Sequence, residues 1–265
     1  MGATFHAQGS NQLPDIGTAG VAALPIEQEV RYGNAFMRFA RAGLPIIDDP
    51  VLNEYIDDLG QRLLTNADGV RFPFTFFLIN DPSINAAAFL GGRVKVHTGL
   101  FLYAESESEL ASVLAHEITH VTQRHIARYM EAQASSSAMT LAGLVGSIAL
   151  AVINPTAGIA ALQTTLGLSM QSAINYTRDN EYEADRIGMK TLYDAGFDPM
   201  GMANFFQKLA AEYRYASKPP EMLLTHPLPE TRISEARARA GSYGARALPP
   251  SLDFWLAKVR IQVRY

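Results

Sequence analysis

The sequence predicts an α+β fold that is mostly helical with one small β-sheet, and three observations lead to this expectation. Apolar residues recur at helical spacing over most of the chain, and two short runs in its first half have strand character. The chain has 265 residues, of which 48% are hydrophobic, enough for one sizeable core. We expect one main domain over residues 21–250, preceded by a flexible lead-in over 1–20.

Two helices followed by two strands are expected in the N-terminal part of the chain. Helical spacing runs over 27–41 and again over 49–66, where Asp49-Pro50 supplies a cap and a proline in the first turn. The aromatic and β-branched run 74–79 and the alternating run 93–97 are interpreted as two strands of a small sheet.

Beyond Gly99 the pattern is helical almost to the end of the chain. The longest helix is expected to begin near residues 107–109 and to run through Glu131, because no Gly or Pro interrupts it. Its apolar stripe consists of Leu110, Val113, Leu114, Ile118 and Val121.

An uncharged run over residues 141–153 ends at Asn154-Pro155, and a second, mostly apolar stretch continues to Ala173. The run is shorter than the roughly 20 residues that a bilayer requires. Two interpretations stay open: a buried helical hairpin, or a mobile lid that contacts a membrane surface through residues 141–170.

The amino-acid composition limits which metal ligands and binding partners the chain can have. The chain has no cysteine, which excludes disulfides and thiolate metal sites, so zinc would need imidazole and carboxylate ligands. The formal net charge of -4 gives no electrostatic case for binding nucleic acid. The first residues lack the basic start and apolar core of a signal peptide, so the chain is either cytosolic or a mature form.

A zinc-binding motif lies inside the expected long helix, where His116 and His120 flank Glu117 in the pentapeptide H-E-I-T-H. Residues four apart share one face of a helix, so both imidazoles can bind one ion. Zinc lowers the pKa of a bound water and Glu117 can take its proton, so the motif predicts a hydrolase. His125 would lie about 180 degrees from His116 on the same helix, and we expect it to be a surface or packing residue.

A catalytic zinc ion needs a third protein ligand. Glu181 and Asp185 lie four apart on a later helical stretch and share a face, whereas Glu183 points the other way. We expect Glu181 to bind the metal and Asp185 to accept a hydrogen bond from the far nitrogen of a ligand histidine. A plain acidic surface is the alternative, but the apolar spacing that follows favours a packed helix.

Peptide hydrolysis also needs groups that stabilise an oxyanion. His226 and Arg232 are candidates, in a turn that enters a helix. A histidine before a proline is also common at a structural corner, so the residues alone leave both interpretations open.

These motifs resemble a known family. The chain resembles the gluzincin zinc peptidases of the HtpX and CaaX-processing type, and within them the BepA-like periplasmic β-barrel assembly-enhancing proteases. The resemblance extends over nearly the whole chain and is carried by Leu13-Pro14-Asp15-Ile16-Gly17, Asn85-Ala86, Gly91-Gly92 and residues 116–125, 180–188 and 225–230.

The resemblance implies roles for single residues. Glu181 matches the third ligand of one Zn2+ per chain, and Asp185 matches the aspartate behind a ligand histidine. His226 matches a histidine that can take the fourth zinc position and hold the enzyme latent. Arg232 matches an arginine implicated in stabilising the oxyanion.

It also implies an architecture in which the small sheet lies beside the H-E-x-x-H helix. In related peptidases an edge strand aligns an extended substrate by backbone pairing. Here Asn85 lies on the approach to the matching strand, which consists of Gly92, Arg93, Val94, Lys95 and Val96.

The resemblance further implies a place and a task. Proteins of this kind act in the periplasm on unfolded or misassembled outer-membrane proteins, with the barrel-assembly machinery as partner. They carry a helical tetratricopeptide region after the peptidase domain, so residues 251–265 are interpreted as the truncated beginning of such a region.

Two other functions remain to be separated from this one. A chaperone-like binding module could hold the same zinc ion for structure, but such a site has no use for Glu117 as a base. Hydrolysis of a prenylated peptide would require a multi-pass membrane chamber, which this chain lacks.

Overall fold

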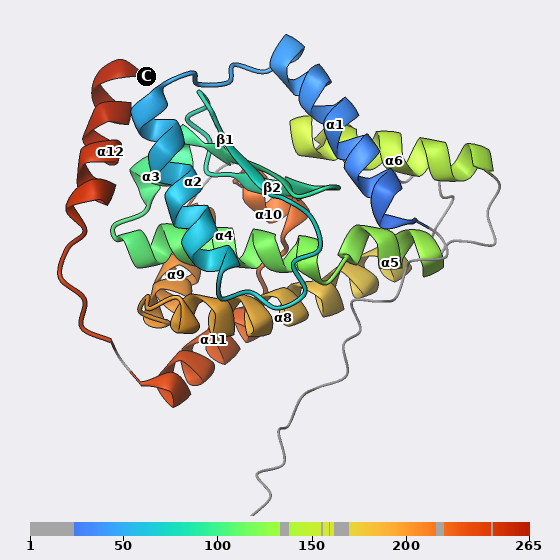
Figure 1. Ribbon diagram of the computed structural model, residues 1–265. Coiled ribbons are helices and arrows are strands. Elements are labelled where there is room, and N and C mark those ends of the chain that lie inside the picture. The colour runs from blue at the N-terminus through green and yellow to red at the C-terminus, as the bar shows by residue number, and fades with distance from the viewer. Residues whose placement is uncertain are drawn as a thin grey trace, which may run out of the picture.

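A computed structural model confirms the predicted α+β class, with helices enclosing one small sheet (Figure 1). It describes residues 24–132, 138–154, 156–158, 160–161, 170–215, 220–244 and 246–265. The expected lead-in over 1–20 lies outside these residues. The strands are β1 (Thr75–Ile79), β2 (Ala86–Phe89) and β3 (Arg93–His97).

Helices precede and follow the sheet in the chain. They are α1 (Ile26–Gly43), α2 (Pro50–Leu64), α3 (Thr98–Tyr103), α4 (Glu107–Thr122), α5 (His125–Ala132), α6 (Ala138–Ile153), α8 (Met170–Asp194), α9 (Met200–Tyr215), α10 (Glu221–Thr225), α11 (Glu230–Tyr243) and α12 (Leu252–Arg264).

The cap predicted for the second helix is present. Asp49 accepts a hydrogen bond from the backbone N–H of Val51 at 3.1 Å, and Pro50 is the first residue of α2. Arg260 and Arg264 of α12 bind the same carboxylate at 2.8 and 2.9 Å. The last helix therefore lies against the second, as Figure 1 shows.

The sheet has the order β1-β3-β2, so β3 is its central strand. It pairs with β1 in parallel and with β2 in antiparallel orientation. The expectation that residues 92–96 form an edge strand is therefore wrong, because both sides of β3 are already paired. The strand β2 escapes prediction because its sequence, Ala-Ala-Ala-Phe, is rich in a residue that is uncommon in strands.

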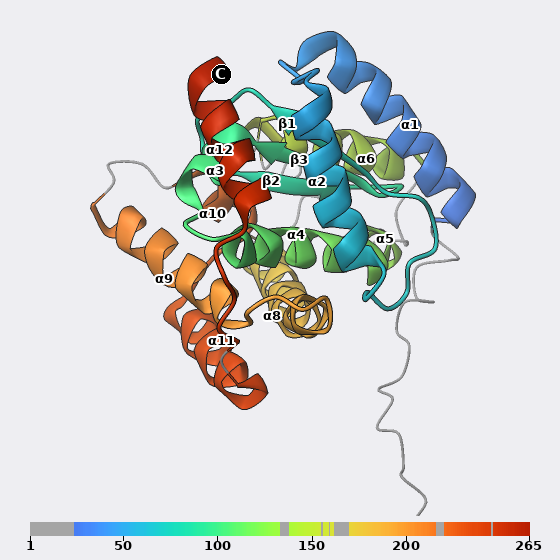
Figure 2. The same cartoon turned by 60° about the vertical axis from the view of Figure 1, so that its left-hand side comes forward.

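Hydrophobic side chains cover both faces of the sheet. Val94 and Val96 pack on the side of α2 and α4, whereas Phe77 and Phe89 pack on the side of α1 and α6. In both views α4 lies between the sheet and α8 (Figures 1 and 2). Nearly every residue of α4 is buried, which places the H-E-I-T-H motif inside the molecule.

The expected continuous helix through Glu131 is wrong, because α4 ends at Thr122 and α5 begins at His125. Between them Arg124 has a φ of 54°, in the left-handed region that few residues other than glycine adopt. Its guanidinium donates to the carboxylate of Glu29 in α1 at 2.8 Å, and both side chains are buried. The break between α4 and α5 thus contains no Gly or Pro, and it coincides with an ion pair between Arg124 and the distant helix α1.

The uncharged run 141–153 forms most of α6. Val152 is buried and Val145 and Ile148 are half-buried against the hydrophobic cluster of α1 and the sheet, whereas Leu150 is exposed, so α6 buries one face. Residues 162–169 of the expected second arm lie outside the described residues, so the hairpin and the lid both stay predictions. Among the helices that the structure describes, none combines the length and the apolarity that crossing a membrane requires.

Candidate metal centre

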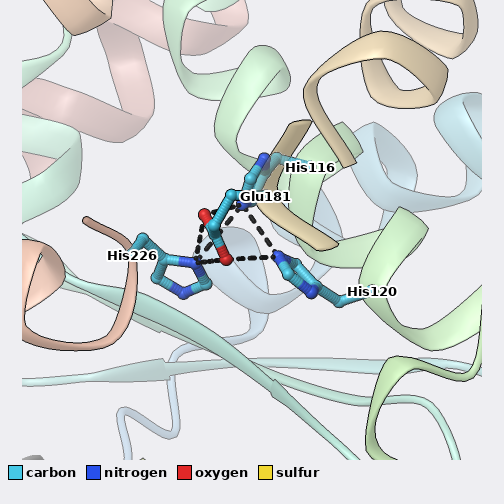
Figure 3. Close-up of side chains that lie close together, drawn as sticks. All are labelled: His116, His120, Glu181 and His226. Carbon is cyan, nitrogen blue, oxygen red and sulfur yellow. Dashed lines mark hydrogen bonds and ion pairs between the residues drawn. The ribbon is translucent and has the colours of Figure 1, made fainter. Parts of the chain in front are cut away.

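Three imidazoles and one carboxylate meet beside the sheet (Figure 3). His116 and His120 come from α4, Glu181 from α8, and His226 directly follows α10. One possible ligand atom of each residue lies within 4.8 Å of those of the others. The Nε2 atoms of the two α4 histidines are 2.9 Å apart, and the Glu181 carboxylate lies 3.3 Å from each of them.

These four residues fit a metal ion. Imidazole nitrogen and carboxylate oxygen are ligands that zinc takes in proteins. The Nδ1 atoms of His116 and His120 contact Asp185 and His125 respectively, so both Nε2 atoms can present their lone pairs to the centre of the cluster. Converging lone pairs repel one another unless a cation lies between them.

Glu181 reaches the cluster because α8 packs closely on α4. A Cβ atom added at Gly188 of α8 would lie 3.1 Å from the backbone of Ala115 and His116. Glycine therefore allows a close approach of the two helices that a larger residue would oppose. Burial alone would raise the pKa of Glu181, but the charges of His226 and the other basic neighbours hold that pKa well below its usual value.

Asp185 and Arg232 lie behind His116. The Nδ1 atom of His116 is 3.0 Å from the Asp185 carboxylate, in the arrangement expected from the sequence. Arg232 of α11 donates to Asp185 at 2.7 and 2.8 Å and to Glu181 at 2.9 Å, and it is 2% exposed. Because Arg232 is bound to these two carboxylates, its position favours a role in holding them over the expected stabilisation of an oxyanion.

His125 and Glu183 lie behind His120, an arrangement that the sequence does not predict. His125 is 4% exposed rather than at the surface, and its Nδ1 atom is 2.8 Å from Nδ1 of His120. Its Nε2 atom is 3.1 Å from Glu183, which also binds Arg128 at 2.7 Å. The expected separation of 180 degrees assumed a continuous helix, and the break at Arg124 removes that assumption.

Glu117 is buried beside the cluster, with its two carboxylate oxygens in different surroundings. Oε2 accepts a hydrogen bond from the backbone N–H of Ala88 in β2 at 2.8 Å. Oε1 lies 3.3 Å from Nε2 of His226 and has no hydrogen-bond partner among the described residues. Burial raises the pKa of Glu117 against the opposing charges of His226 and His116, which suits a group that accepts and releases protons.

The strand expected to align substrate does not offer a free edge. Its residues belong to or adjoin the paired central strand β3, and they are Gly92, Arg93, Val94, Lys95 and Val96. The edge nearest to Glu117 is that of β2, because the N–H of Ala88 points away from β3. Asn85, just before β2, is buried, and its Oδ1 atom has no hydrogen-bond partner in the described part of the chain.

A mainly apolar pocket lies beside His116 and His226. Its lining comes from α4, α9 and the segment around α10, which are far apart in the sequence, so no local pattern predicts it. The apolar lining residues are Val113, Phe206, Leu209, Met222, Leu223 and Leu228.

Several known proteins are similar to this sequence over most of its length. A β-barrel assembly-enhancing protease of Escherichia coli K12 is 50% identical over 97% of the chain, and the Yersinia pestis protein of that name is 53% identical over 96%. A Vibrio cholerae protein provisionally given the same name is 60% identical over 96%. The chain spans only 52 to 53% of the length of these relatives.

A family model covers the cluster as well. The model of peptidase family M48 matches residues 50–240, a span that includes all four clustered residues and Glu117. Since this match extends over well more than half of the 265 residues, the chain belongs to peptidase family M48.

Proposed function

We propose that this chain is the catalytic domain of a zinc endopeptidase. The observation that carries the proposal is the position of Glu117, a buried carboxylate beside the metal-binding cluster. One of its oxygens accepts a hydrogen bond from Ala88, and the other has no hydrogen-bond partner among the residues that the structure describes. A structural metal site has no need of such a group. A hydrolytic site requires it as a general base.

His116, His120 and Glu181 would hold the zinc ion. When bound, zinc supplies Lewis acidity that lowers the pKa of a water molecule toward neutrality. The Ala88 N–H fixes Oε2 of Glu117, so that Oε1 is oriented to accept a proton from the water and to return it to the leaving amine. Arg232 would keep the charge and direction of Glu181 by binding its carboxylate at 2.9 Å.

His226 would make the site latent at rest. Its Nδ1 atom is 3.1 Å from Glu181, and its Nε2 atom is 3.3 Å from Oε1 of Glu117, so the ring fills the space that the reacting water needs. A catalytic zinc site keeps one position open, whereas a fourth protein ligand closes it. Displacement of the segment that carries His226 would then activate the enzyme.

The substrate would be an extended segment of an unfolded protein. Backbone groups on the outer edge of β2 other than the Ala88 N–H, which Glu117 occupies, could pair with such a segment, and Asn85 lies directly before this strand. The apolar pocket beside His116 and His226 has a volume of only about 10 Å³, room for about one water molecule, so it would have to widen before it could accept a hydrophobic side chain. The strand proposed to align the substrate is therefore β2, and not the central strand β3 that the sequence suggested.

The names of the relatives point to the setting. By similarity to the β-barrel assembly-enhancing proteases, we propose that the enzyme degrades misassembled or stalled outer-membrane proteins in the periplasm and acts with the barrel-assembly machinery. Residues 251–265 would begin a further helical region, and α12 has an exposed apolar face that such a region could cover. The face contains Leu252, Leu256, Val259 and Val263.

A chaperone-like binding module with a structural zinc site is the second candidate. The presence of His226 in the cluster favours this candidate, because it supplies a fourth protein ligand and structural zinc sites have four. The two candidates differ in what Glu117 and His226 do, so variants of these residues separate them.

The deciding experiment measures casein cleavage and zinc content for the wild type, Glu117→Gln and His226→Ala. Glu117→Gln should retain zinc but lose activity by roughly 10²- to 10⁴-fold, the usual contribution of a general base. Glu54→Gln, an exposed change of the same chemistry on α2, serves as the control and should cleave casein at the rate of the wild type. Full activity of Glu117→Gln would refute the peptidase mechanism.

His226→Ala separates latency from plain ligation. If His226 blocks the water position, its removal should raise the rate of casein cleavage while zinc remains bound. Loss of zinc together with loss of cleavage would instead identify His226 as a ligand that the site cannot lose, and latency would be rejected.

A further inference from the structure

His125 connects a histidine of the metal cluster to a carboxylate outside it. Its Nδ1 atom is 2.8 Å from Nδ1 of His120, and its Nε2 atom is 3.1 Å from Glu183. Arg128 donates to the same Glu183 oxygen at 2.7 Å. Both ring nitrogens of this buried histidine are therefore engaged, and the contacts form a continuous chain from His120 to an ion pair.

The break between α4 and α5 creates this contact. Residues five positions apart on a continuous helix point about 140 degrees away from each other. The left-handed conformation of Arg124 turns the chain between them, so the ring of His125 lies edge-on to that of His120 with centroids 4.8 Å apart. The buried ion pair of Arg124 with Glu29 holds the turn in place.

The direction of each hydrogen bond follows from the cluster. Nε2 of His120 faces Glu181 and His116, so a metal-binding His120 carries its proton on Nδ1. That N–H has the Nδ1 atom of His125 as its acceptor, so His125 must carry its own proton on Nε2 and donate it to Glu183. A neutral His125 thus satisfies both neighbours at once.

We propose that His125 is a positioning residue that selects the metal-binding tautomer of His120 and holds its ring toward the cluster, with Glu183 and Arg128 fixing His125 in turn. The inference rests on the proposed zinc site and adds a residue to it. Partners behind a metal-binding histidine typically contribute 10- to 100-fold to metal affinity. His125 should therefore affect zinc binding without touching the ion.

The simpler alternative is a buried histidine that only fills space. The two roles differ in which substitutions they tolerate. Asn places its side-chain oxygen near the position of Nδ1 and can accept from His120, whereas Gln places its amide near Nε2 and can reach only Glu183. A packing role distinguishes these two amides by size alone, and a positioning role distinguishes them by the nitrogen that they replace.

The test measures the zinc dissociation constant by competition with a chromophoric chelator for the wild type, His125→Asn, His125→Gln and His125→Leu. His125→Gln and His125→Leu should bind zinc 10- to 100-fold more weakly, and His125→Asn should stay close to the wild type. The visible spectrum of the Co2+-loaded proteins should change in the same order, because it reports the arrangement of the ligands.

Other results would overturn the proposal. Equal dissociation constants across the series, or an Asn variant as weak as the Gln variant, would reduce His125 to packing while leaving the zinc peptidase intact. A wild type that binds no zinc at this cluster would defeat the proposed function itself. If His125→Leu does not fold, the comparison of Asn with Gln still decides, since both keep a polar side chain.

Discussion

The two histidines of α4 are supported in different ways. His116 contacts a carboxylate directly, that of Asp185, which buried Arg232 holds. His120 contacts a second imidazole, that of His125, and His125 in turn contacts the carboxylate of Glu183. We call the residues behind His116 and those behind His120 the two sides of the cluster. The contrast shows that a short motif on one helix determines which residues can bind the metal but not which residues support them, because the supporting residues come from different, distant segments.

The largest expected difference between the His116 side and the His120 side of the cluster concerns their contribution to the free energy of unfolding. Arg232 is 2% exposed and binds two buried carboxylates, so Arg232→Ala should lower the free energy of unfolding by about 3–5 kcal/mol. The side chain of Arg128 is 19% exposed and, in the described part of the chain, binds the single carboxylate of Glu183, so Arg128→Ala should cost about 1 kcal/mol or less. Urea denaturation measures the free energy of unfolding of both variants. Similar decreases in Arg232→Ala and Arg128→Ala would contradict the described asymmetry.

A second difference concerns metal affinity. Asp185→Asn removes the charge behind His116 and should weaken zinc binding about 10- to 100-fold. Glu183→Gln acts on His120 only through His125 and should weaken zinc binding less. Chelator competition gives both dissociation constants, and a greater loss in Glu183→Gln would reverse the order of the two sides.

A last expected effect lies outside the site and gives a baseline for acid sensitivity. Hydrogen bonds from Arg260 lower the pKa of Asp49 to about 2, below the value near 3.9 of an unfolded chain. Stability from this group is therefore complete above about pH 4 and is lost as the pH falls toward 2. Asp49→Asn should be less stable than the wild type at pH 7, and the gap should narrow at pH 3.

Urea midpoints at the two pH values test this prediction. A gap that widens on acidification would mean that the pKa of Asp49 is not lowered in the folded state. Any further acid sensitivity that both proteins share then belongs to the rest of the molecule, including the carboxylates on the two sides of the cluster.

The sequence predicts those parts of the molecule that depend on local chemistry. The cap at Asp49, the spacing of His116 and His120, and the shared face of Glu181 and Asp185 follow from helical geometry, and the structure has them in place. Such features need only a few consecutive residues, so a single sequence reveals them.

The remaining features depend on contacts between distant segments. The helix break at Arg124 is accompanied by an ion pair with Glu29, 95 positions away, so the local pattern reads as one helix and His125 is misplaced. The strand order depends on pairing, which the alanine-rich β2 conceals. Arg232 is visible as a basic residue, but only the fold shows that it faces Asp185 and Glu181.

The most direct test of the central claim is a crystal structure of the zinc-loaded protein with anomalous scattering recorded at the zinc absorption edge. The account predicts a single peak enclosed by His116, His120 and Glu181, at about 2.0–2.2 Å from each ligand atom. A zinc-loaded crystal with no peak among these residues, or with its peak elsewhere, would contradict it.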